Sequence, residues 1–209
     1  GTETDVTLTV TVTVGDAMVT KDFVVTVADL SDVPLTVSEA VALWDGENPV
    51  EVTVVGIIAG YDTSQNWQLQ DPDGFGINSY SSEDLTLEVG TMVRFTGTIS
   101  AYYGTIQITD WTLIEVISTG NELTVTDVTA EELATNPADY NGQRVHVELT
   151  LDNPDDGYGF AHFTGIDGVT IKINRLWMPY IDSYEAGAIF DLEGNVFTVK
   201  KTCVVAHKL

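Results

Sequence analysis

Residues 88–97 read "EVGTMVRFTG" and residues 185–194 read "EAGAIFDLEG". Both stretches follow one pattern: Glu, any residue, Gly, two residues, an apolar residue, a charge, an apolar residue, any residue, Gly. Alternation of apolar and polar residues is typical of a β-strand with one buried side. The glycine before it, Gly90 or Gly187, allows the chain to turn sharply into the strand. The two stretches therefore predict the same strand start in two equivalent places of the fold.

The sequence before each stretch repeats as well. "LTVSEAVALW" precedes "VEVTVVGIIAG" in the first half, and "LTVTDVTAEEL" precedes "QRVHVELTLD" in the second. Repetition of this length indicates two copies of one structural unit. With 209 residues, 44% of them hydrophobic, the chain can bury two modest cores. We expect one unit at residues 35–118 and the other at residues 122–209.

Each unit is expected to contain a short helix followed by five strands. In the first unit the helix starts near Thr36 or Ser38, and the long first strand bends at Gly56. The strands of the first unit are expected at residues 50–62, 66–71, 75–80, 91–100 and 105–116. The second unit follows the same order, with a helical lead-in at 128–142, strands at 144–151, 159–174 (a hairpin turning at Asp167 and Gly168) and 188–207, and a helix position at 175–187.

This order of parts resembles the OB-fold, a small Greek-key barrel of five strands. The predicted fold class is therefore mainly β, with two tandem OB-like five-stranded barrels and short helices. Residues 1–30 are expected to form a separate β-hairpin, because "DVTLTVTVTVG" and "VTKDFVVTVADL" both alternate and "GDAM" lies between them. The hairpin resembles the last two strands of a truncated bacterial immunoglobulin-like domain. Alternatively, it packs on the barrel that follows.

Composition restricts the partners that the chain can attract. The net charge is −24, from 32 acidic and 8 basic residues, so long-range attraction to a phosphate backbone is not expected. Most of the basic residues lie after residue 122. No apolar run reaches the roughly 18 residues of a membrane span. The chain begins at Gly1 and opens on a strand, which favours an excised piece of a longer protein.

Catalytic and metal-binding motifs are not expected. The three histidines, His146, His162 and His207, have no metal-ligand spacing, and His146 should face solvent on its strand. Cys203 lies in the apolar run "TCVVA", which is typical of a buried, inert thiol. The acidic loops "QDPDGFG" and "LDNPDDGYG" are both explained by turn formation, and the second does not fit a calcium loop. We therefore predict no enzyme activity, no metal and no cofactor.

Candidate ligand residues follow from the surface that OB-folds use, which is the face of strands two and three and the loops beside it. Aromatic rings that can stack, next to amides that donate and accept hydrogen bonds, suit a sugar or an unstacked base. In the first unit the candidates are Tyr61, Trp67, Gln68, Gln70, Tyr102 and Tyr103. In the second unit they are His162, Lys172, Asn174 and Arg175, with Tyr158 in the adjoining loop. The alternatives are that Trp67 is a core residue and that the charges form an ordinary solvated face.

The first unit also resembles the OB-fold modules of bacterial extracellular nucleases and related surface lipoproteins, through "VTVVGIIAG", "NWQLQDPDG" and "VGTMVRFTGTI". The second unit lacks the "LQDPDG" phrase. The resemblance implies an extracellular or cell-surface setting and a non-catalytic accessory module within a larger protein. Such a module would bind an oligosaccharide or a single-stranded nucleic acid and contact other domains of its parent. A structural spacer and a non-catalytic fragment of an extracellular nuclease remain the alternatives.

Overall fold

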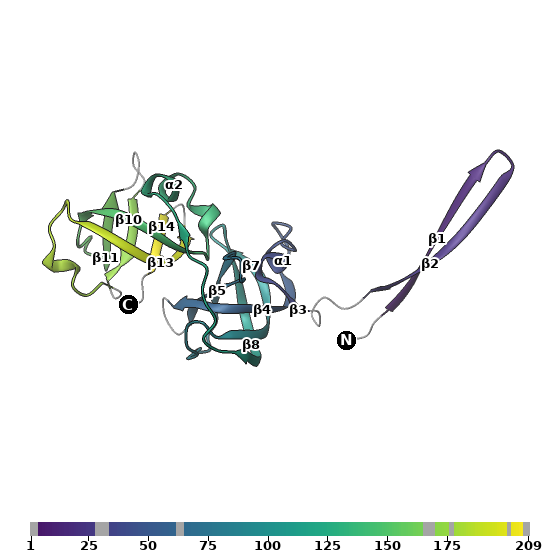
Figure 1. Cartoon of the computed structure of the whole chain (residues 1–209), viewed down its shortest axis with the longest axis horizontal. Coiled ribbons are helices and arrows are strands. Elements are labelled where there is room, and N and C mark those ends of the chain that lie inside the picture. The colour runs from purple at the N-terminus through teal and green to yellow at the C-terminus, as the bar shows by residue number, and fades with distance from the viewer. Residues whose placement is uncertain are drawn as a thin grey trace.

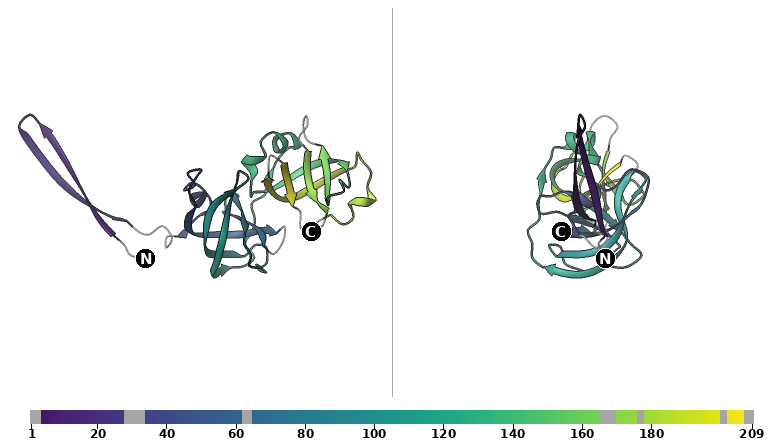
Figure 2. Two further views of the ribbon diagram at one scale, coloured as in Figure 1. Left: turned by 180° about the vertical axis from the view of Figure 1, so that it is seen from behind. Right: turned by 90° about the vertical axis from the view of Figure 1, so that its right-hand side faces the viewer.

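The computed structural model describes residues 4–27, 34–61, 65–164, 170–175, 178–199 and 202–206. The chain is mainly β, as predicted, and consists of one hairpin and two barrels (Figure 1). Seen from behind, the barrels lie next to each other and the hairpin stands clear of both (Figure 2). Among the described residues, no helix has the length and apolarity needed to cross a membrane.

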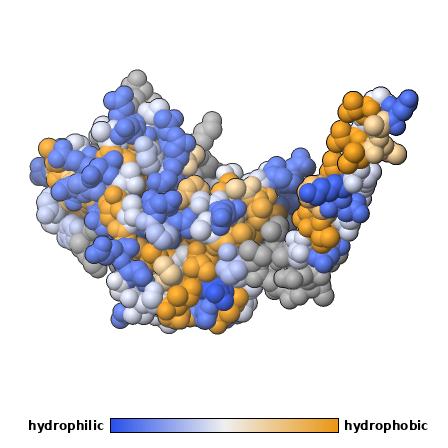
Figure 3. Space-filling view, turned by 45° about the vertical axis from the view of Figure 1, so that its right-hand side comes forward, coloured by the Kyte–Doolittle hydropathy of each residue, from blue (hydrophilic) through white to orange (hydrophobic). Residues whose placement is uncertain are grey.

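The hairpin pairs β1 (Thr4–Val14) with β2 (Ala17–Val27) around a turn at Gly15, whose φ is +59°. One face carries apolar cross-strand pairs such as Leu8 opposite Phe23. These side chains are exposed, and the hydropathy surface shows the hairpin largely in orange (Figure 3). The hairpin therefore does not pack on the barrel that follows it, so that alternative is wrong. Resemblance to an immunoglobulin-like domain stays a prediction.

The first barrel is a closed ring of five strands. Their bounds are β4 (Val50–Tyr61), β5 (Asn66–Gln70), β6 (Gly76–Tyr80), β7 (Met92–Tyr102) and β8 (Thr105–Ser118). The ring runs β4, β5, β6, β8, β7 and back to β4, with β6 and β8 parallel and the other neighbours antiparallel. The two-residue strand β3 (Pro34–Leu35) adds to β4, and helix α1 (Val37–Val41) follows it.

The second barrel repeats this arrangement strand for strand. Its strands are β10 (Arg144–Asn153), β11 (Phe160–Thr164), β12 (Thr170–Asn174), β13 (Ile189–Val199) and β14 (Thr202–Ala206). The ring runs β10, β11, β12, β14, β13 and back to β10, again with the third and fifth strands parallel. Strand β9 (Thr126–Asp127), helix α2 (Ala130–Thr135), and the short 3₁₀ helices η1 (Pro137–Tyr140) and η3 (Ile181–Ser183) complete the unit.

The repeated stretch that begins each fourth strand forms the same turn twice. Gly90 has a φ of +87° and donates its N–H to Ile58, while Thr91 donates to Glu88. In the second barrel, Gly187 has a φ of +94° and donates to Leu151, while Ala188 donates to Glu185. A positive φ is the conformation that glycine adopts at least cost. The predicted equivalence of the two glycines is confirmed.

Both helices begin with the same capping arrangement. Thr36 accepts a hydrogen bond from the Glu39 N–H, and the Glu39 carboxylate accepts one from the Thr36 N–H. Thr129 and Glu132 make the same reciprocal pair at α2. Such a capping box satisfies two N–H groups that the helix leaves unpaired. Of the two predicted start residues, Thr36 is the N-cap.

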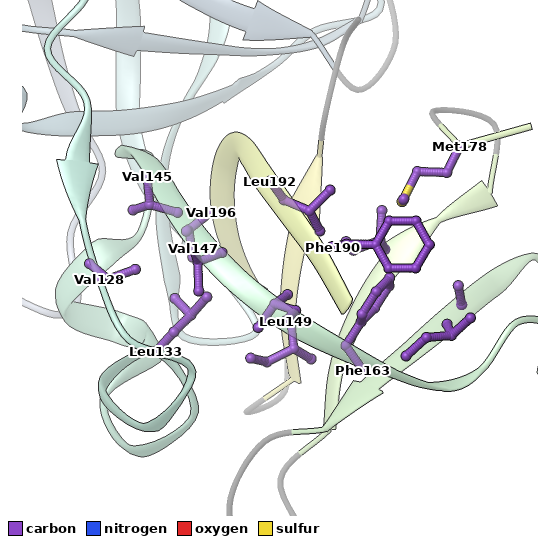
Figure 4. Packing of buried hydrophobic residues seen from close by; sticks show 14 of the residues in the cluster. Val128, Leu133, Val145, Val147, Leu149, Phe163, Met178, Phe190, Leu192 and Val196 are labelled. Atoms are coloured by element: carbon purple, nitrogen blue, oxygen red, sulfur yellow. The ribbon is translucent and has the colours of Figure 1, made fainter. Parts of the chain in front are cut away.

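Each barrel has its own core. In the first, Trp67 packs edge-on against Phe95 at 5.5 Å and Trp111 at 5.3 Å between ring centroids. In the second, Phe163 meets Phe190 at 5.7 Å, and α2 contributes buried Leu133 (Figure 4). The bend expected at Gly56 stays a prediction, since Gly56 pairs regularly with Val93 and the register irregularity of β4 falls between Ile58 and Gly60. Gly56 instead gives room to Val37 of α1, whose methyl would lie 3.0 Å from an added Cβ.

Three expectations fall on parts of the chain that the structure leaves out. The turn at Asp167 and Gly168 and the terminal His207 lie outside the described residues. For Cys203 the backbone is described, as part of β14, but the side chain is not. Its predicted burial stays a prediction.

Candidate functional site

The face predicted to bind ligands on the first barrel is covered. Trp67 and Leu69 point into the core, as alternation requires, so Gln68 and Gln70 point outward. Both amides are nevertheless buried, at 2% and 0% exposure. Gln70 donates to the carbonyl of Thr124, in the segment that joins the two barrels, at 2.8 Å. The two amides thus lie on the outer side of the barrel, but this side is not open to solvent.

The second barrel supplies most of this cover. Asn78 of β6 donates to the side chain of Asn141 at 2.9 Å, and Arg144 of β10 donates to the carbonyl of Ala59 at 2.8 Å. Thr105 and Thr198 place their hydroxyls 3.4 Å apart across the same junction. Three polar contacts between the barrels, and the contact of Gln70 with the joining segment, hold the barrels in one relative orientation.

Two glycines bring the barrel backbones into direct contact. A Cβ added to Gly142 would lie 2.3 Å from the N of Ile77, and one added to Gly76 would lie 2.0 Å from the O of Gly142. Real Cβ atoms do not approach backbone this closely, so both positions need glycine for this junction to form. We call the surface made by Gly76, Asn78, Asn141, Gly142 and Arg144 the inter-barrel junction.

The prediction that Tyr61 and Trp67 bind a ligand at the surface is also wrong, because both side chains are buried. The Tyr61 ring is 9% exposed and its hydroxyl donates to the carbonyl of Leu87 at 2.7 Å. Burial raises the pKa of Tyr61 to about 12, partly offset by that hydrogen bond. Trp67 is 1% exposed. Both belong to the core, so Tyr61, Trp67, Gln68 and Gln70 cannot bind a ligand on this barrel while the junction is closed.

Tyr102 and Tyr103 differ from these residues because they are exposed, at 55% and 59%. Their rings meet edge to face with centroids 4.5 Å apart. Tyr103 has a φ of +49°, and Gly104 follows with a φ of +87°. A non-glycine residue rarely takes this left-handed conformation. The chain therefore turns here between the fourth and fifth strands, and both candidate rings are open to solvent.

On the second barrel the predicted face is partly exposed, and two of its basic side chains, His162 and Lys172, converge on Asp156. The Asp156 carboxylate lies 3.0 Å from Nε2 of His162 and 3.7 Å from Nζ of Lys172. It also accepts the N–H groups of Tyr158, at 2.8 Å, and Phe160, at 3.1 Å. Burial alone would raise the pKa of Asp156, but these hydrogen bonds lower it to about 2. Asp156 is therefore a carboxylate at neutral pH.

Arg175 is fixed in the same way by two further carboxylates. It pairs with Asp155 at 2.6 Å and with both carboxylate oxygens of Asp182. The hydrogen bonds to Asp182 raise the pKa of Arg175 further. The side chain of Asn174 is not described. The structure thus brings together His162, Lys172 and Arg175, as predicted, but pairs each of them with an aspartate.

A cleft of about 530 Å³ opens beside Arg175. Its walls combine an exposed tyrosine, apolar side chains and an ion pair, and the lining residues are Tyr158, Gly159, Phe160, Arg175, Met178, Pro179 and Asp182. Tyr158 is 88% exposed. We call these residues the second-barrel cleft. Sequence analysis did not predict Asp155, Asp156 or Asp182 as site residues. The acidic pair in "LDNPDDGYG" is Asp155 and Asp156, and it was explained only by turn formation.

The remaining polar clusters have structural roles. In "QDPDGFG", Gly74 donates to the carbonyl of Asp71 and Asp71 donates to Phe75, which confirms a turn. The Asp71 carboxylate accepts hydrogen bonds from the N–H groups of Val37, at 2.6 Å, and Ser38, at 2.9 Å.

Within the described residues, no group of three or more His, Cys, Asp or Glu side chains is suited to hold a metal ion.

His146 faces solvent, as predicted, but it has two partners that the sequence did not indicate. Nδ1 lies 2.7 Å from Asp127 and Nε2 lies 2.5 Å from Asp191, so the ring links three neighbouring strands. The hydrogen bond with Asp127, and then that with Asp191, raise the pKa of His146 above its ordinary 6.5.

This arrangement makes part of the stability depend on pH. A raised pKa in the folded state stabilises the fold below pH about 6.5, and the contribution is lost as pH rises through the folded-state pKa. The melting temperature of the wild type should therefore exceed that of His146→Asn at pH 5.5 and approach it at pH 9. A difference that is the same at both pH values would contradict this. The difference should also shrink in 0.5 M NaCl, because the three groups are exposed.

Comparison with known proteins assigns no family. No protein-family model matches this sequence, and no curated protein matches it. Function must therefore be argued from the geometry of the second-barrel cleft and of the inter-barrel junction.

Proposed function

We propose that the chain is a non-catalytic binding module of a secreted or cell-surface bacterial protein, and that its second-barrel cleft binds an oligosaccharide. The observation that carries the proposal is Arg175, held between Asp155 and Asp182 beside the exposed ring of Tyr158. Carboxylates accept hydrogen bonds from sugar hydroxyls, and the guanidinium donates them. Because the ion pairs fix these side chains before a ligand arrives, binding costs little ordering entropy.

The charges in and next to the cleft favour an uncharged ligand over a nucleic acid. The cleft contains Arg175 and Asp182, and the ion pairs next to it add two aspartates, Asp155 and Asp156, and one permanent cation, Lys172. A phosphate would have to break an existing ion pair and approach a chain of net charge −24. Single-stranded nucleic acid, the other ligand that the OB-fold resemblance implies, is therefore less favoured than a sugar.

The rest of the chain supports a role as one part of a larger protein. The ring order of each barrel, with the third and fifth strands parallel, supports the proposed OB-fold module. The first barrel would then serve as a rigid support, since its own face is covered. The uncovered apolar side of the hairpin is what one sheet of an immunoglobulin-like sandwich would present to the other. A spacer with no ligand is the second candidate, and the closed inter-barrel junction favours it.

The test is calorimetric titration of the intact chain with neutral hexasaccharides of glucose, xylose and mannose. Packing about 60 Å² of the Tyr158 ring against a sugar contributes about 1.5 kcal/mol. Tyr158→Ala should therefore weaken binding about tenfold. Tyr80→Ala, which removes a tyrosine exposed to 47% on the first barrel, is the matched control and should change nothing.

Other outcomes select the alternatives. Binding of a single-stranded oligonucleotide at 20 mM NaCl that disappears at 200 mM would favour the nucleic-acid ligand. If neither sugars nor oligonucleotides bind, the spacer is favoured and the proposed function is wrong.

A further inference from the structure

One side of the β1–β2 hairpin is an exposed apolar surface. Side chains directly opposite each other in an antiparallel pair point to the same side, so the cross-strand pairs collect the apolar residues of both strands on one face. Their exposed fractions run from 42% to 74%. We call this surface the hairpin face, and its large apolar residues are Val6, Leu8, Val10, Val12, Val14, Val19, Phe23 and Val25.

The opposite side of the hairpin is mainly polar and forms its own hydrogen bonds. Thr9 donates to Asp22 and Thr26 donates to Asp5, each at 2.7 Å. This side is therefore suited to water, whereas the hairpin face is not. A two-stranded hairpin without a second layer is at best marginally stable in water. We therefore expect a second layer to cover the hairpin face.

The hairpin face is large enough for a specific interface between two copies of the chain. Its side chains leave roughly 700 Å² open, so two such faces packed together remove up to about 1,400 Å² from water. Specific protein interfaces bury about 1,200 to 2,000 Å² in total. A second copy also matches the first in length, because both strands of the hairpin have 11 residues.

The distribution of charge favours the hairpin as the place where two copies meet. The chain has a net charge of −24, but residues 4–27 contribute only three aspartates and one lysine to it. Most of the repulsion between two copies therefore comes from the barrels. The hairpin stands clear of both barrels (Figure 2), so two hairpins whose turns point in opposite directions keep the barrels of the two copies at opposite ends.

We propose that two copies of the chain dimerise by packing their hairpin faces together as a four-stranded sandwich of two layers. The second copy takes the position that the other sheet holds in an immunoglobulin-like sandwich. The interface is the same patch on both copies, so the contact closes on itself and forms a dimer rather than a filament. It involves none of the residues of the second-barrel cleft, and the dimer does not depend on the sugar-binding proposal.

Lys21 limits the strength of this dimer. It lies on the hairpin face opposite Val10, and its ammonium group lies over the Phe23 ring, 5.2 Å from the centroid. Covering the face removes water from this cation in both copies, which costs free energy. Lys21→Thr should therefore strengthen the dimer, because threonine keeps a high strand propensity and carries no charge.

Sedimentation velocity of the intact chain between 2 µM and 500 µM tests the proposal. We expect the average mass to rise from one chain toward two with concentration. Raising NaCl from 20 mM to 500 mM should strengthen association, because salt screens the repulsion between the two acidic chains. The double variant Leu8→Thr, Phe23→Thr should weaken association at least tenfold, because four apolar side chains are lost from each dimer.

The matched control is the double variant Met18→Thr, Val24→Thr. It removes two apolar side chains, exposed to 68% and 65%, from the opposite side of the same hairpin, and it should leave association unchanged. Tyr158→Ala, in the second-barrel cleft, should leave it unchanged as well. A chain that stays monomeric at 500 µM in 500 mM NaCl, as wild type and as Lys21→Thr, would overturn the proposal and leave the hairpin face to a different sheet. Equal weakening by the two double variants would overturn it too.

Discussion

Replacing Gly142 by alanine should separate the two barrels while each stays folded. An added Cβ would lie 2.3 Å from N and 2.5 Å from Cα of Ile77, both backbone atoms, so no side chain can rotate to make room. The barrels would have to move apart by about 1 Å, which breaks the hydrogen bonds from Asn78 to Asn141 and from Arg144 to Ala59. With the strain of a positive φ added, we expect a loss of about 3 kcal/mol in unfolding free energy.

Gly157→Ala is the matched control for this variant. Gly157 has the same φ as Gly142, +79°, but an added Cβ would meet nothing within 4 Å. It should therefore show the strain alone, about 1 kcal/mol. Urea unfolding measures both losses, and small-angle X-ray scattering should show a larger maximum dimension for Gly142→Ala alone. Equal losses, with unchanged scattering, would mean that the backbones are not in contact at the junction.

Replacing Asp71 by alanine should destabilise the first barrel about as strongly. Its carboxylate is 3% exposed and accepts hydrogen bonds from Val37 and Ser38, so it satisfies two N–H groups at the start of α1. Thr36 satisfies the next one, from Glu39. Removal of the carboxylate leaves two donors unpaired in a buried place, and each costs about 1 to 3 kcal/mol. We expect a loss of about 3 kcal/mol in unfolding free energy.

Asp73→Ala is the control, because Asp73 is exposed and accepts one longer hydrogen bond, 3.3 Å from the N–H of Phe75. It should cost less than about 1 kcal/mol. Urea unfolding followed by tryptophan fluorescence reports mainly on this barrel, which holds Trp44, Trp67 and Trp111 of the four tryptophans. A loss for Asp71→Ala no larger than that for Asp73→Ala would contradict the anchoring role.

The sequence predicted the barrels well because their construction is local and repeated. Alternation identified the strands, and the Glu-x-Gly stretches located Gly90 and Gly187, whose turns are made by hydrogen bonds to the same strand positions in both barrels. The capping threonines lie a few residues from the glutamates they pair with, so the helix starts were visible too. Patterns within one unit are set by neighbours along the chain.

Contacts between the units left no such pattern. Alternation placed Gln68 and Gln70 on the outer side of β5, and nothing within the first unit indicates that the second barrel covers that side. Gly76 lies in an expected strand and Gly142 at the end of the expected helical lead-in, and neither position indicated that the two barrel backbones meet there. The cations at Lys172 and Arg175 were visible, whereas their pairing with aspartates from two other loops depended on the closed fold.

We expect a sugar to bind to the exposed face of the second barrel and not to the covered face of the first. The most direct measurement is NMR mapping of backbone amide shifts in the intact chain during titration with the tightest-binding neutral hexasaccharide. We expect shifts at residues 156–164 and 170–175, with Tyr158 and Arg175 among the largest, and none along β5 and β6. Shifts concentrated at residues 66–70 and 76–80, with the second barrel unchanged, would show that the junction opens to expose the first barrel and would contradict the claim.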